Sequence, residues 1–246
     1  MKYNFENKVA MITGAGSGIG QAASLLLASY GCNLCLVDLN EENLSQTKAR
    51  IKQDVEILIK VGDVTDTVFL KQCVDVIDDK FKRLDFAFNN AGMASAALSI
   101  ADLEIEMWNK QINVNLNSIF YCMHYQIPLM LKTGGGAIVN TSSILGTVAA
   151  RNRSAYIAAK HGVTGLSKAA ALDYADQNIR VNSIHPGYIE TPLIAHFDTA
   201  EIERKHPMQR LGKASEIAEL VSFLLSGDAS FVTGANYAID GGYVTQ

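Results

Sequence analysis

A tyrosine and a lysine are spaced in this sequence so that they can carry out acid–base chemistry together. Tyr156 and Lys160 lie four residues apart in a stretch with a helical pattern, so we expect both side chains on one face of a helix. A free phenol has a pKa of about 10, which is too high for an efficient base near neutral pH. A cation within about 4–6 Å lowers the pKa of an acid by about 1–3 units. We therefore expect Lys160 to lower the pKa of Tyr156 and make it a usable proton carrier.

Two polar residues upstream give this pair a more specific meaning. Ser143 follows a predicted strand that ends with Asn140 and Thr141, and Asn115 opens a predicted helix. Reduction of a carbonyl needs a proton at oxygen as a hydride reaches carbon, and oxidation of an alcohol needs the reverse. We expect Ser143 to orient the substrate oxygen by hydrogen bonding, and Asn115 to hold a water that links Lys160 to solvent.

A carrier for the hydride is predicted near the N-terminus. Residues 13–20 read Thr-Gly-Ala-Gly-Ser-Gly-Ile-Gly, where the first predicted strand turns into the first predicted helix. Glycines let the backbone approach a pyrophosphate closely, and a helix N-terminus supplies N–H groups and positive potential. The glycine spacing is G-x-x-x-G-x-G and differs from the literal G-x-G-x-x-G fingerprint, so a purely structural loop is the alternative.

Asp38 favours the dinucleotide interpretation of this loop. It ends the second predicted strand, where a carboxylate binds both hydroxyls of an adenosine ribose. The 2′-phosphate of NADP would meet a like charge there, and no Lys or Arg stands between Val9 and Lys48 to receive it. The pattern predicts NAD(H), with a solvated aspartate at a strand end as the simpler alternative.

The turns after the third and fourth predicted strands point to the same place. Asp63 and Val64 follow one strand, and residues 90–92 follow the next. Ligands of an open parallel sheet lie outside the carboxyl ends of its strands, so these turns face one crevice. We expect Asp63 to meet the adenine, unless it is only a cap or turn residue. We expect Lys160 to bind the nicotinamide ribose as well, and the charge of oxidised nicotinamide to help it lower the pKa of the phenol.

Short apolar runs alternate with longer helical patterns along the whole chain. This alternation predicts an α/β, Rossmann-like, doubly wound parallel sheet in three layers. No linker divides the chain, so we expect a single domain over residues 1–246, with a substrate loop at about 186–209. The predicted strands are 8–13, 32–38, 55–61, 84–89, 136–141, 180–185 and 237–240. The predicted helices are 19–30, 41–53, 67–80, 104–113, 115–132, 154–176 and 215–225.

Composition excludes several classes of protein. A net charge of −4 argues against a nucleic-acid partner, and the absence of an 18-residue apolar run argues against a membrane span. The first residues lack the apolar stretch of a secretory signal, so we expect a cytoplasmic enzyme. Cys32 and Cys35 have C-x-x-C spacing, but no second pair follows, and we expect buried structural thiols. No cluster has metal-ligand spacing, and a tyrosine-based proton transfer requires no metal.

Taken together, these motifs resemble the classical short-chain dehydrogenase/reductase family over nearly the whole chain. Residues 13–20 match its glycine motif, 89–92 its second motif, and 156–160 its active-site motif. Pro186-Gly187 followed by Thr191 resembles the segment that binds the nicotinamide carboxamide, and residues 234–242 the closing motif. The resemblance implies a catalytic tetrad of Asn115, Ser143, Tyr156 and Lys160, a preference for NAD(H), and a homotetramer.

The predicted cofactor-binding residues come from the carboxyl ends of the strands and the segments that follow them. They are Gly14, Ser17, Gly18, Ile19, Asp38, Leu39, Asp63, Val64, Asn90, Ala91, Gly92, Tyr156, Lys160, Pro186, Gly187, Ile189 and Thr191.

Arg153, Tyr188 and Ser143 are the predicted substrate contacts. Arg153 stands three residues before Tyr156, and in the similar 3-hydroxybutyrate dehydrogenases a lysine at the matching place binds a carboxylate. A short-chain hydroxy acid is therefore an alternative substrate, although Leu145 and Ala94 depart from the polar residues of those enzymes. The other interpretation of Arg153 is a solvated helix start or a subunit contact.

The remaining side chains of the predicted pocket suggest a partly apolar wall. Besides Tyr188, these are Leu193, Ile194 and Phe197, which fit a ring or a short aliphatic substrate. The four histidines considered are expected outside the chemistry: His161 and His185 as packing residues, His196 and His206 solvated in the substrate loop.

The sequence therefore predicts an NAD(H)-dependent oxidoreductase that interconverts a secondary alcohol and a ketone. A non-catalytic NAD(H)-binding protein is an alternative, but it need not retain the four catalytic residues. An extended-family epimerase or dehydratase usually adds a C-terminal substrate domain, for which there is no room.

Overall fold

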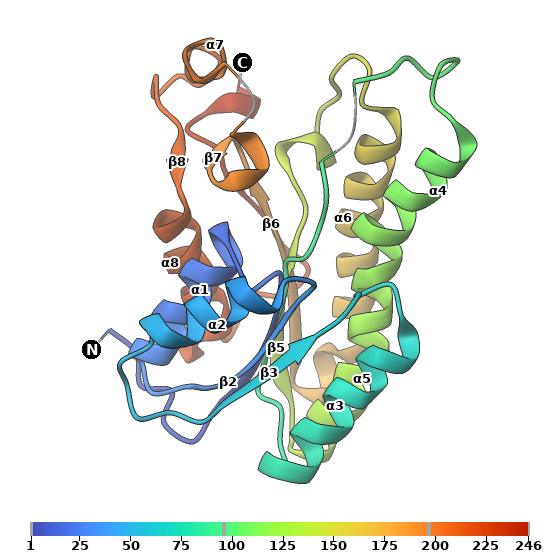
Figure 1. Cartoon of the computed structure of the whole chain (residues 1–246). Coiled ribbons are helices and arrows are strands. Elements are labelled where there is room, and N and C mark those ends of the chain that lie inside the picture. The colour runs from blue at the N-terminus through green and yellow to red at the C-terminus, as the bar shows by residue number, and fades with distance from the viewer. Residues whose placement is uncertain (1, 95–96, 196–197, 246) are drawn as a thin grey trace.

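The computed structural model describes residues 2–94, 97–195 and 198–245 and contains one central seven-stranded sheet. The strand order is β3-β2-β1-β4-β5-β6-β9, and every neighbouring pair is parallel (Figure 1). The strands are β1 (Val9–Thr13), β2 (Asn33–Asp38), β3 (Ile57–Val61), β4 (Phe86–Asn89), β5 (Gly136–Thr141), β6 (Ile179–Pro186) and β9 (Asn236–Ile239).

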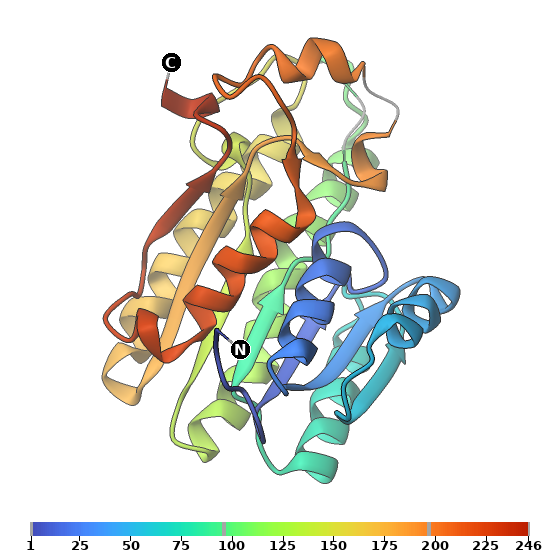
Figure 2. The ribbon, with the colours of Figure 1, turned by 90° about the vertical axis from the view of Figure 1, so that its left-hand side faces the viewer.

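Helices cover both faces of this sheet and make the fold three-layered, as predicted (Figures 1 and 2). One face carries α1 (Gly18–Ser29), α2 (Glu41–Arg50) and α8 (Ala214–Leu225). The other carries α3 (Thr67–Phe81), α4 (Ile105–Ile112), α5 (Ser118–Lys132) and α6 (Ser154–Tyr174). The Rossmann-like doubly wound class is confirmed.

The inner strands of the sheet divide their apolar side chains between two cores, as β1 shows. All five residues of β1 are buried, and Ala10 and Ile12 pack with the α1 and α8 side. Val9 and Met11 pack with the α3, α5 and α6 side. Successive side chains of a strand point to opposite faces, so a strand covered on both sides must be apolar throughout.

The strand order reverses at β1, which pairs with β2 on one side and with β4 on the other. The helices that follow β1 and β4 therefore lie on opposite faces of the sheet. A crevice opens at the carboxyl ends of strands where the order reverses in this way. The fold places residues from the turns after β1, β2, β4 and β5 around one opening.

Two predictions of local structure were wrong. The helices expected at 104–113 and 115–132 form one run, in which a π-helical segment, Asn113–Asn117, joins α4 to α5. Asn115 therefore lies inside this run and does not open a helix. The stretch expected to be irregular contains a short helix, α7 (Thr199–Glu203), and two short strands. These strands, β7 (Ile189–Glu190) and β8 (Gly212–Lys213), pair with each other.

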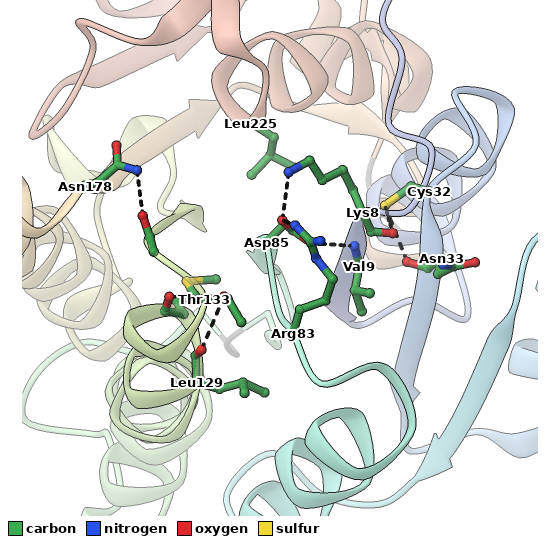
Figure 3. Close-up of polar contacts among 12 residues, drawn as sticks. Lys8, Val9, Cys32, Asn33, Arg83, Asp85, Leu129, Thr133, Asn178 and Leu225 are labelled. Atoms are coloured by element: carbon green, nitrogen blue, oxygen red, sulfur yellow. Dashed lines mark hydrogen bonds and ion pairs between the residues drawn. The ribbon is translucent and has the colours of Figure 1, made fainter.

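A buried carboxylate, that of Asp85, lies at the amino-terminal ends of the neighbouring strands β1 and β4. Asp85 is 7% exposed and accepts hydrogen bonds from the Val9 N–H at 3.0 Å and from Arg83 Nε at 2.8 Å (Figure 3). The ammonium of Lys8 lies 3.0 Å from the same carboxylate. Burial raises the pKa of Asp85, but these donors outweigh burial and the pKa is lowered. This cluster lies at the opposite end of the strands from the crevice.

The four cysteines are free and buried, as predicted. Burial raises the pKa of every one of these thiols, that of Cys122 to about 12, so they are poor nucleophiles. None of the described helices is long and apolar enough to cross a membrane. Among the described side chains, no group of three or more His, Cys, Asp or Glu is arranged to hold a metal ion.

Candidate active site

One crevice of about 610 Å³ opens at the carboxyl ends of the central strands. It is lined by all four predicted catalytic residues and by every predicted cofactor-binding residue. Of the three predicted substrate contacts, only Ser143 lines it; Tyr188 lines a smaller cavity behind it. Lining residues that the sequence analysis did not single out for the crevice are Gly62, Met93, Lys110, Val114, Thr141, Ser142 and Pro192.

Glycine is required in the loop after β1 by close backbone approaches. Gly14 and Gly18 have φ of +67° and +52°, backbone angles that residues other than glycine rarely adopt. A Cβ on Gly20 would lie 2.0 Å from the carbonyl oxygen of Gly14. The last glycine of the G-x-x-x-G-x-G spacing therefore lets α1 pack against the loop, and it leaves the N-terminal end of α1 open to the crevice.

Asp38 is held at the end of β2 beside this loop. Its Oδ2 accepts a hydrogen bond from Gly16 N at 2.9 Å, and its Oδ1 accepts one from Asn40 N at 3.0 Å. Two N–H donors fix the orientation of the carboxylate and leave its other lone pairs for ribose hydroxyls. The donor set of the crevice, with a glycine loop, a helix N-terminus and a fixed carboxylate, suits an adenine dinucleotide without a 2′-phosphate.

The turn after β4 is tied to its neighbours on both sides. Thr13 Oγ1 accepts from Asn90 N and Ala91 N, both at 3.0 Å. Thr141 Oγ1 donates to Asn90 Oδ1 at 3.3 Å, which links β4 to β5. The turn therefore has a fixed position between the glycine loop and the catalytic strand. Asp63, after β3, accepts from Thr65 N at 2.8 Å, so it has a turn role besides lining the crevice.

A fully buried amide network supports the strands that carry the catalytic groups. Asn89 Nδ2 donates to Gln126 Oε1 at 3.1 Å and to Asn140 Oδ1 at 3.0 Å, and Gln126 Nε2 donates back to Asn89 Oδ1 at 2.9 Å. Asn140 Nδ2 in turn donates to Ser167 Oγ on α6 at 2.9 Å. A satisfied buried network rigidifies its surroundings. The network connects β4, β5 and α6 directly beneath the crevice.

The four predicted catalytic side chains converge in the structure. A Cβ on Gly92 would lie 2.9 Å from Asn115 Oδ1 and 3.8 Å from Lys160 Nζ, so these two groups meet at one glycine. Lys160 Nζ lies 5.5 Å from the centroid of the Tyr156 ring. Ser143 forms a side-chain hydrogen bond with Tyr156 that lowers the pKa of the phenol. Acid–base and hydrogen-bonding groups therefore surround one point.

The amide of Asn115 has definite partners. Its Oδ1 accepts from Met93 N at 3.0 Å, and its Nδ2 donates to Gln111 Oε1 at 3.0 Å. Asn115 thus anchors the segment that follows Gly92. The amide retains one N–H, so a role in holding water stays a prediction.

The prediction that Lys160 lowers the pKa of Tyr156 was wrong for the protein without cofactor, in which this pKa is raised. Burial raises the pKa of Tyr156, and the Ser143 hydrogen bond and the charge of Arg153 lower it only in part. Burial also lowers the pKa of Lys160 to about 8. The lysine directs its ammonium to the Thr141 carbonyl at 2.8 Å. Desolvation outweighs the neighbouring charge because the pocket removes both groups from water.

His185 is a packing residue, as predicted, but it also touches the catalytic strand. It is 1% exposed, and its Nδ1 lies 2.9 Å from the carbonyl oxygen of Ser143. A carbonyl oxygen only accepts, so Nδ1 carries a proton. Burial lowers the pKa of His185, which keeps the ring neutral. The prediction that His161 is a packing residue was wrong, because it is exposed on α6, with its Nδ1 3.0 Å from the Ile157 carbonyl oxygen.

The prediction that His206 is solvated was wrong. It is 2% exposed and lies between the substrate loop and the turn after β6. No local pattern signals this burial, because His206 stands in a polar, proline-containing segment. His196 and Phe197, also predicted in this loop, lie outside the described residues. Arg153 is half-buried at the start of α6, close enough to Tyr156 for its charge to act on the phenol.

Known proteins share this architecture over the full chain. The family model described as enoyl-(acyl carrier protein) reductase matches residues 14–244. A cyclohexanol dehydrogenase of Acinetobacter sp. is 48% identical, with 100% of this chain and 98% of that protein covered. Levodione reductase of Leifsonia aquatica is 36% identical over 97% of this chain and 94% of that protein. The crystal structure of carveol dehydrogenase from Mycobacterium avium in complex with NAD has a TM-score of 0.96, with 29% identity, 99% of this chain and 100% of that chain covered.

Proposed function

The chain belongs to the short-chain dehydrogenase/reductase family and is an NAD(H)-dependent oxidoreductase of secondary alcohols and ketones, and we propose that its substrate carries this group on a six-membered carbon ring. The observation that carries the proposal is that the predicted cofactor-binding residues and the catalytic residues line the same crevice. Its cofactor residues adjoin Ser143 and Tyr156, and its wall contains the apolar Met93, Leu193 and Ile194. A compact apolar ring suits such a wall because its burial needs no polar partner beyond the reacting oxygen.

The residues of the chain have separate roles in the proposed reaction. Bound nicotinamide supplies a hydride to the carbonyl carbon, or accepts one from the alcohol. In the reductive direction Tyr156 donates its proton to the substrate oxygen, and in the oxidative direction it takes that proton back. Ser143 Oγ accepts from Leu145 N at 3.1 Å, and its hydroxyl, which bonds Tyr156 in the absence of substrate, can turn to donate to the same oxygen.

Lys160 and Asn115 act around this proton transfer. With a pKa of about 8, Lys160 is mostly charged at neutral pH and favours the phenolate that forms during reduction. The Thr141 carbonyl fixes the ammonium, so little reorganisation is needed. We propose that Lys160 also binds the nicotinamide ribose and that Asn115 orders water beside it. No step of this scheme needs a metal ion.

Relatives with cyclic substrates support the choice of a ring. The similar proteins are named for cyclohexanol, levodione and carveol. The short-chain hydroxy acid remains the second candidate, because the positive charge of Arg153 acts on the phenol and an anionic substrate would profit from it. The two candidates differ in charge, so one variant separates them.

Initial rates with NAD⁺ test the proposal directly. We expect kcat/KM for cyclohexanol to exceed that for 2-hexanol, an open-chain alcohol with the same number of carbons, by at least about tenfold (1.4 kcal/mol of selective binding). Arg153→Leu should leave the cyclohexanol rate nearly unchanged. Equal rates on both alcohols, or 3-hydroxybutyrate as the best substrate with a selective loss in Arg153→Leu, would reject the ring proposal.

We further propose that the enzyme is a cytoplasmic homotetramer. Exposed apolar side chains on two neighbouring helices support assembly: Phe120 on α5 is 49% exposed and Leu172 on α6 is 83% exposed. Four free, buried thiols suit a reducing compartment. Light scattering on the purified protein and cell fractionation check the two parts; a monomeric mass would reject the first.

A further inference from the structure

The turn that follows β6 has two sides. Pro186, Gly187 and Ile189 line the main crevice, whereas Tyr188 lines a separate cavity of about 160 Å³ together with His206. Two backbone hydrogen bonds also hold the turn: Gly187 N donates to Ile239 O at 3.1 Å, and Gly212 N donates to Tyr188 O at 3.0 Å. His206 therefore contacts the nicotinamide side of the crevice from behind.

The two hydrogen bonds of His206 define its tautomer. Tyr188 N donates to His206 Nε2 at 3.2 Å, so Nε2 must be unprotonated. The Nδ1 atom lies 2.8 Å from the carbonyl oxygen of Ile202, so Nδ1 must carry the proton. Ile202 belongs to α7 and is 3% exposed. One imidazole thus contacts both α7 and the turn.

The surroundings of the ring keep it in this place. Its plane meets that of Tyr188 at 85° with centroids 5.8 Å apart, and Tyr243 lies 5.4 Å away on the C-terminal segment. A Cβ on Gly187 would lie 2.9 Å from His206 Nε2, so the turn approaches the imidazole as closely as a glycine allows. Figure 1 shows α7, β7, β8 and the C-terminal end gathered in this part of the molecule.

We infer that His206 is a positioning residue that couples the substrate loop to the nicotinamide side of the crevice. Through Nε2 it holds the Tyr188 N–H, and with it the 186–189 turn. Nδ1 bonds back to Ile202 O, four residues earlier in the same segment, and so orients the ring, while the chain itself joins His206 to α7. The inference rests on the proposed cofactor site: a cofactor that orders the turn also orders α7, and an ordered loop tightens cofactor binding by the same factor.

Two amide substitutions separate the two hydrogen bonds. The amide of glutamine reaches about as far as Nε2, and that of asparagine about as far as Nδ1. His206→Gln thus retains an acceptor for Tyr188 N–H, His206→Asn retains only a donor near Ile202 O, and His206→Phe keeps the ring without either bond. His161→Gln, on the exposed face of α6, is the control.

Two measurements on the full chain test the coupling. Fluorescence titration should give NADH dissociation constants about tenfold higher for His206→Asn and His206→Phe, because the partly buried Tyr188 N–H loses its acceptor. The value for His206→Gln should stay within about threefold of the parent protein and of the control. Trypsin should cleave after Arg204 and Lys205 faster in the Asn and Phe variants, with or without NADH, and NADH should protect only the parent, the Gln variant and the control.

Other outcomes would overturn the inference. Equal NADH binding and equal cleavage in all variants would show that the link has no effect. Equal impairment of all three His206 variants, together with a common fall in melting temperature, would reduce His206 to a packing residue. If the parent protein bound no NADH, the proposed cofactor site would fail, while faster cleavage of the Asn and Phe variants without NADH would still support the link between turn and loop.

Discussion

The ammonium of Lys160 lies 5.5 Å from the centroid of the Tyr156 ring and donates to the carbonyl oxygen of Thr141 at 2.8 Å. The two groups thus share one face of α6, as their spacing requires, yet the lysine is fixed by a strand and not by the phenol. Both are taken out of water, which raises the pKa of Tyr156 and lowers that of Lys160. We therefore expect a bound cofactor, with its own positive charge when oxidised, to bring the phenol into a useful range.

Tyr156→Phe removes the proposed proton carrier and little else. We expect kcat to fall by about 10²–10⁴-fold, the usual contribution of general acid–base catalysis. The NADH dissociation constant should change by less than about threefold, because the ring and the glycine loop are retained. Steady-state rates and fluorescence titration measure the two quantities. A variant that keeps the parental kcat would remove Tyr156 from the mechanism.

Lys160→Met should inactivate the enzyme and stabilise the cofactor-free protein. Lys160 is 3% exposed, and burial lowers its pKa from 10.5 to about 8, so keeping it charged below pH 8 costs roughly 3–4 kcal/mol. Between pH 8 and 10.5 the unfolded chain binds more protons at this residue than the folded chain. The stability of the parent protein should therefore rise with pH in this window relative to the variant.

Urea unfolding at pH 7 and pH 10 checks this prediction. The stability gain of Lys160→Met should be largest at pH 7 and smaller at pH 10. Comparison of the two proteins at each pH cancels the titration of the buried cysteines, which both share. A variant less stable than the parent at pH 7 would mean that the ammonium is well solvated.

Asp38→Asn should relax the preference for NAD(H) over NADP(H). The substitution removes the negative charge that would repel a 2′-phosphate, and we expect the kcat/KM ratio for NADP(H) over NAD(H) to rise at least about tenfold. Part of this change should be a loss with NAD(H), because one of the two N–H donors to Asp38 loses its acceptor. Adding Leu39→Arg at a 69% exposed position should raise the ratio further. An unchanged ratio in the double variant would place the adenosine ribose elsewhere.

Asp85→Ala should destabilise the fold without affecting the chemistry. Lys8 and Arg83 have side chains that are 42% and 36% exposed and can turn to water, so the main cost is the orphaned Val9 N–H (Figure 3). We expect a loss of about 2 kcal/mol at pH 7 by urea unfolding. The folded pKa of Asp85 is lowered, so its contribution is present above the ordinary carboxyl pKa of about 4 and is lost as pH falls through the folded value.

The difference in free energy of unfolding between Asp85→Ala and the parent protein should thus become smaller toward pH 3. The kcat of the variant at pH 7 should equal that of the parent. A change in kcat would indicate that this edge of the sheet communicates with the crevice.

Much of the fold and of the candidate site was predictable because its signals are local. The alternation of apolar runs and helical patterns gave the sheet, with boundaries displaced by a few residues. Glycines at 14, 18 and 20 mark a turn whose backbone positions exclude a Cβ, a constraint visible in residue type alone. Tyr156 and Lys160 share a helix, so their relative placement followed from helical geometry.

The remaining features depend on contacts between segments far apart in the chain. The π-helical segment at Asn115, the pairing of β7 with β8 and the burial of His206 leave no periodic signature, since each is decided by what another segment places beside it. The rise in the pKa of Tyr156 likewise depends on the segments that surround this residue. The sequence determined which groups stand near each other along one helix; only the tertiary structure decided how much water surrounds them, because desolvation is a property of the packed pocket and of no single residue.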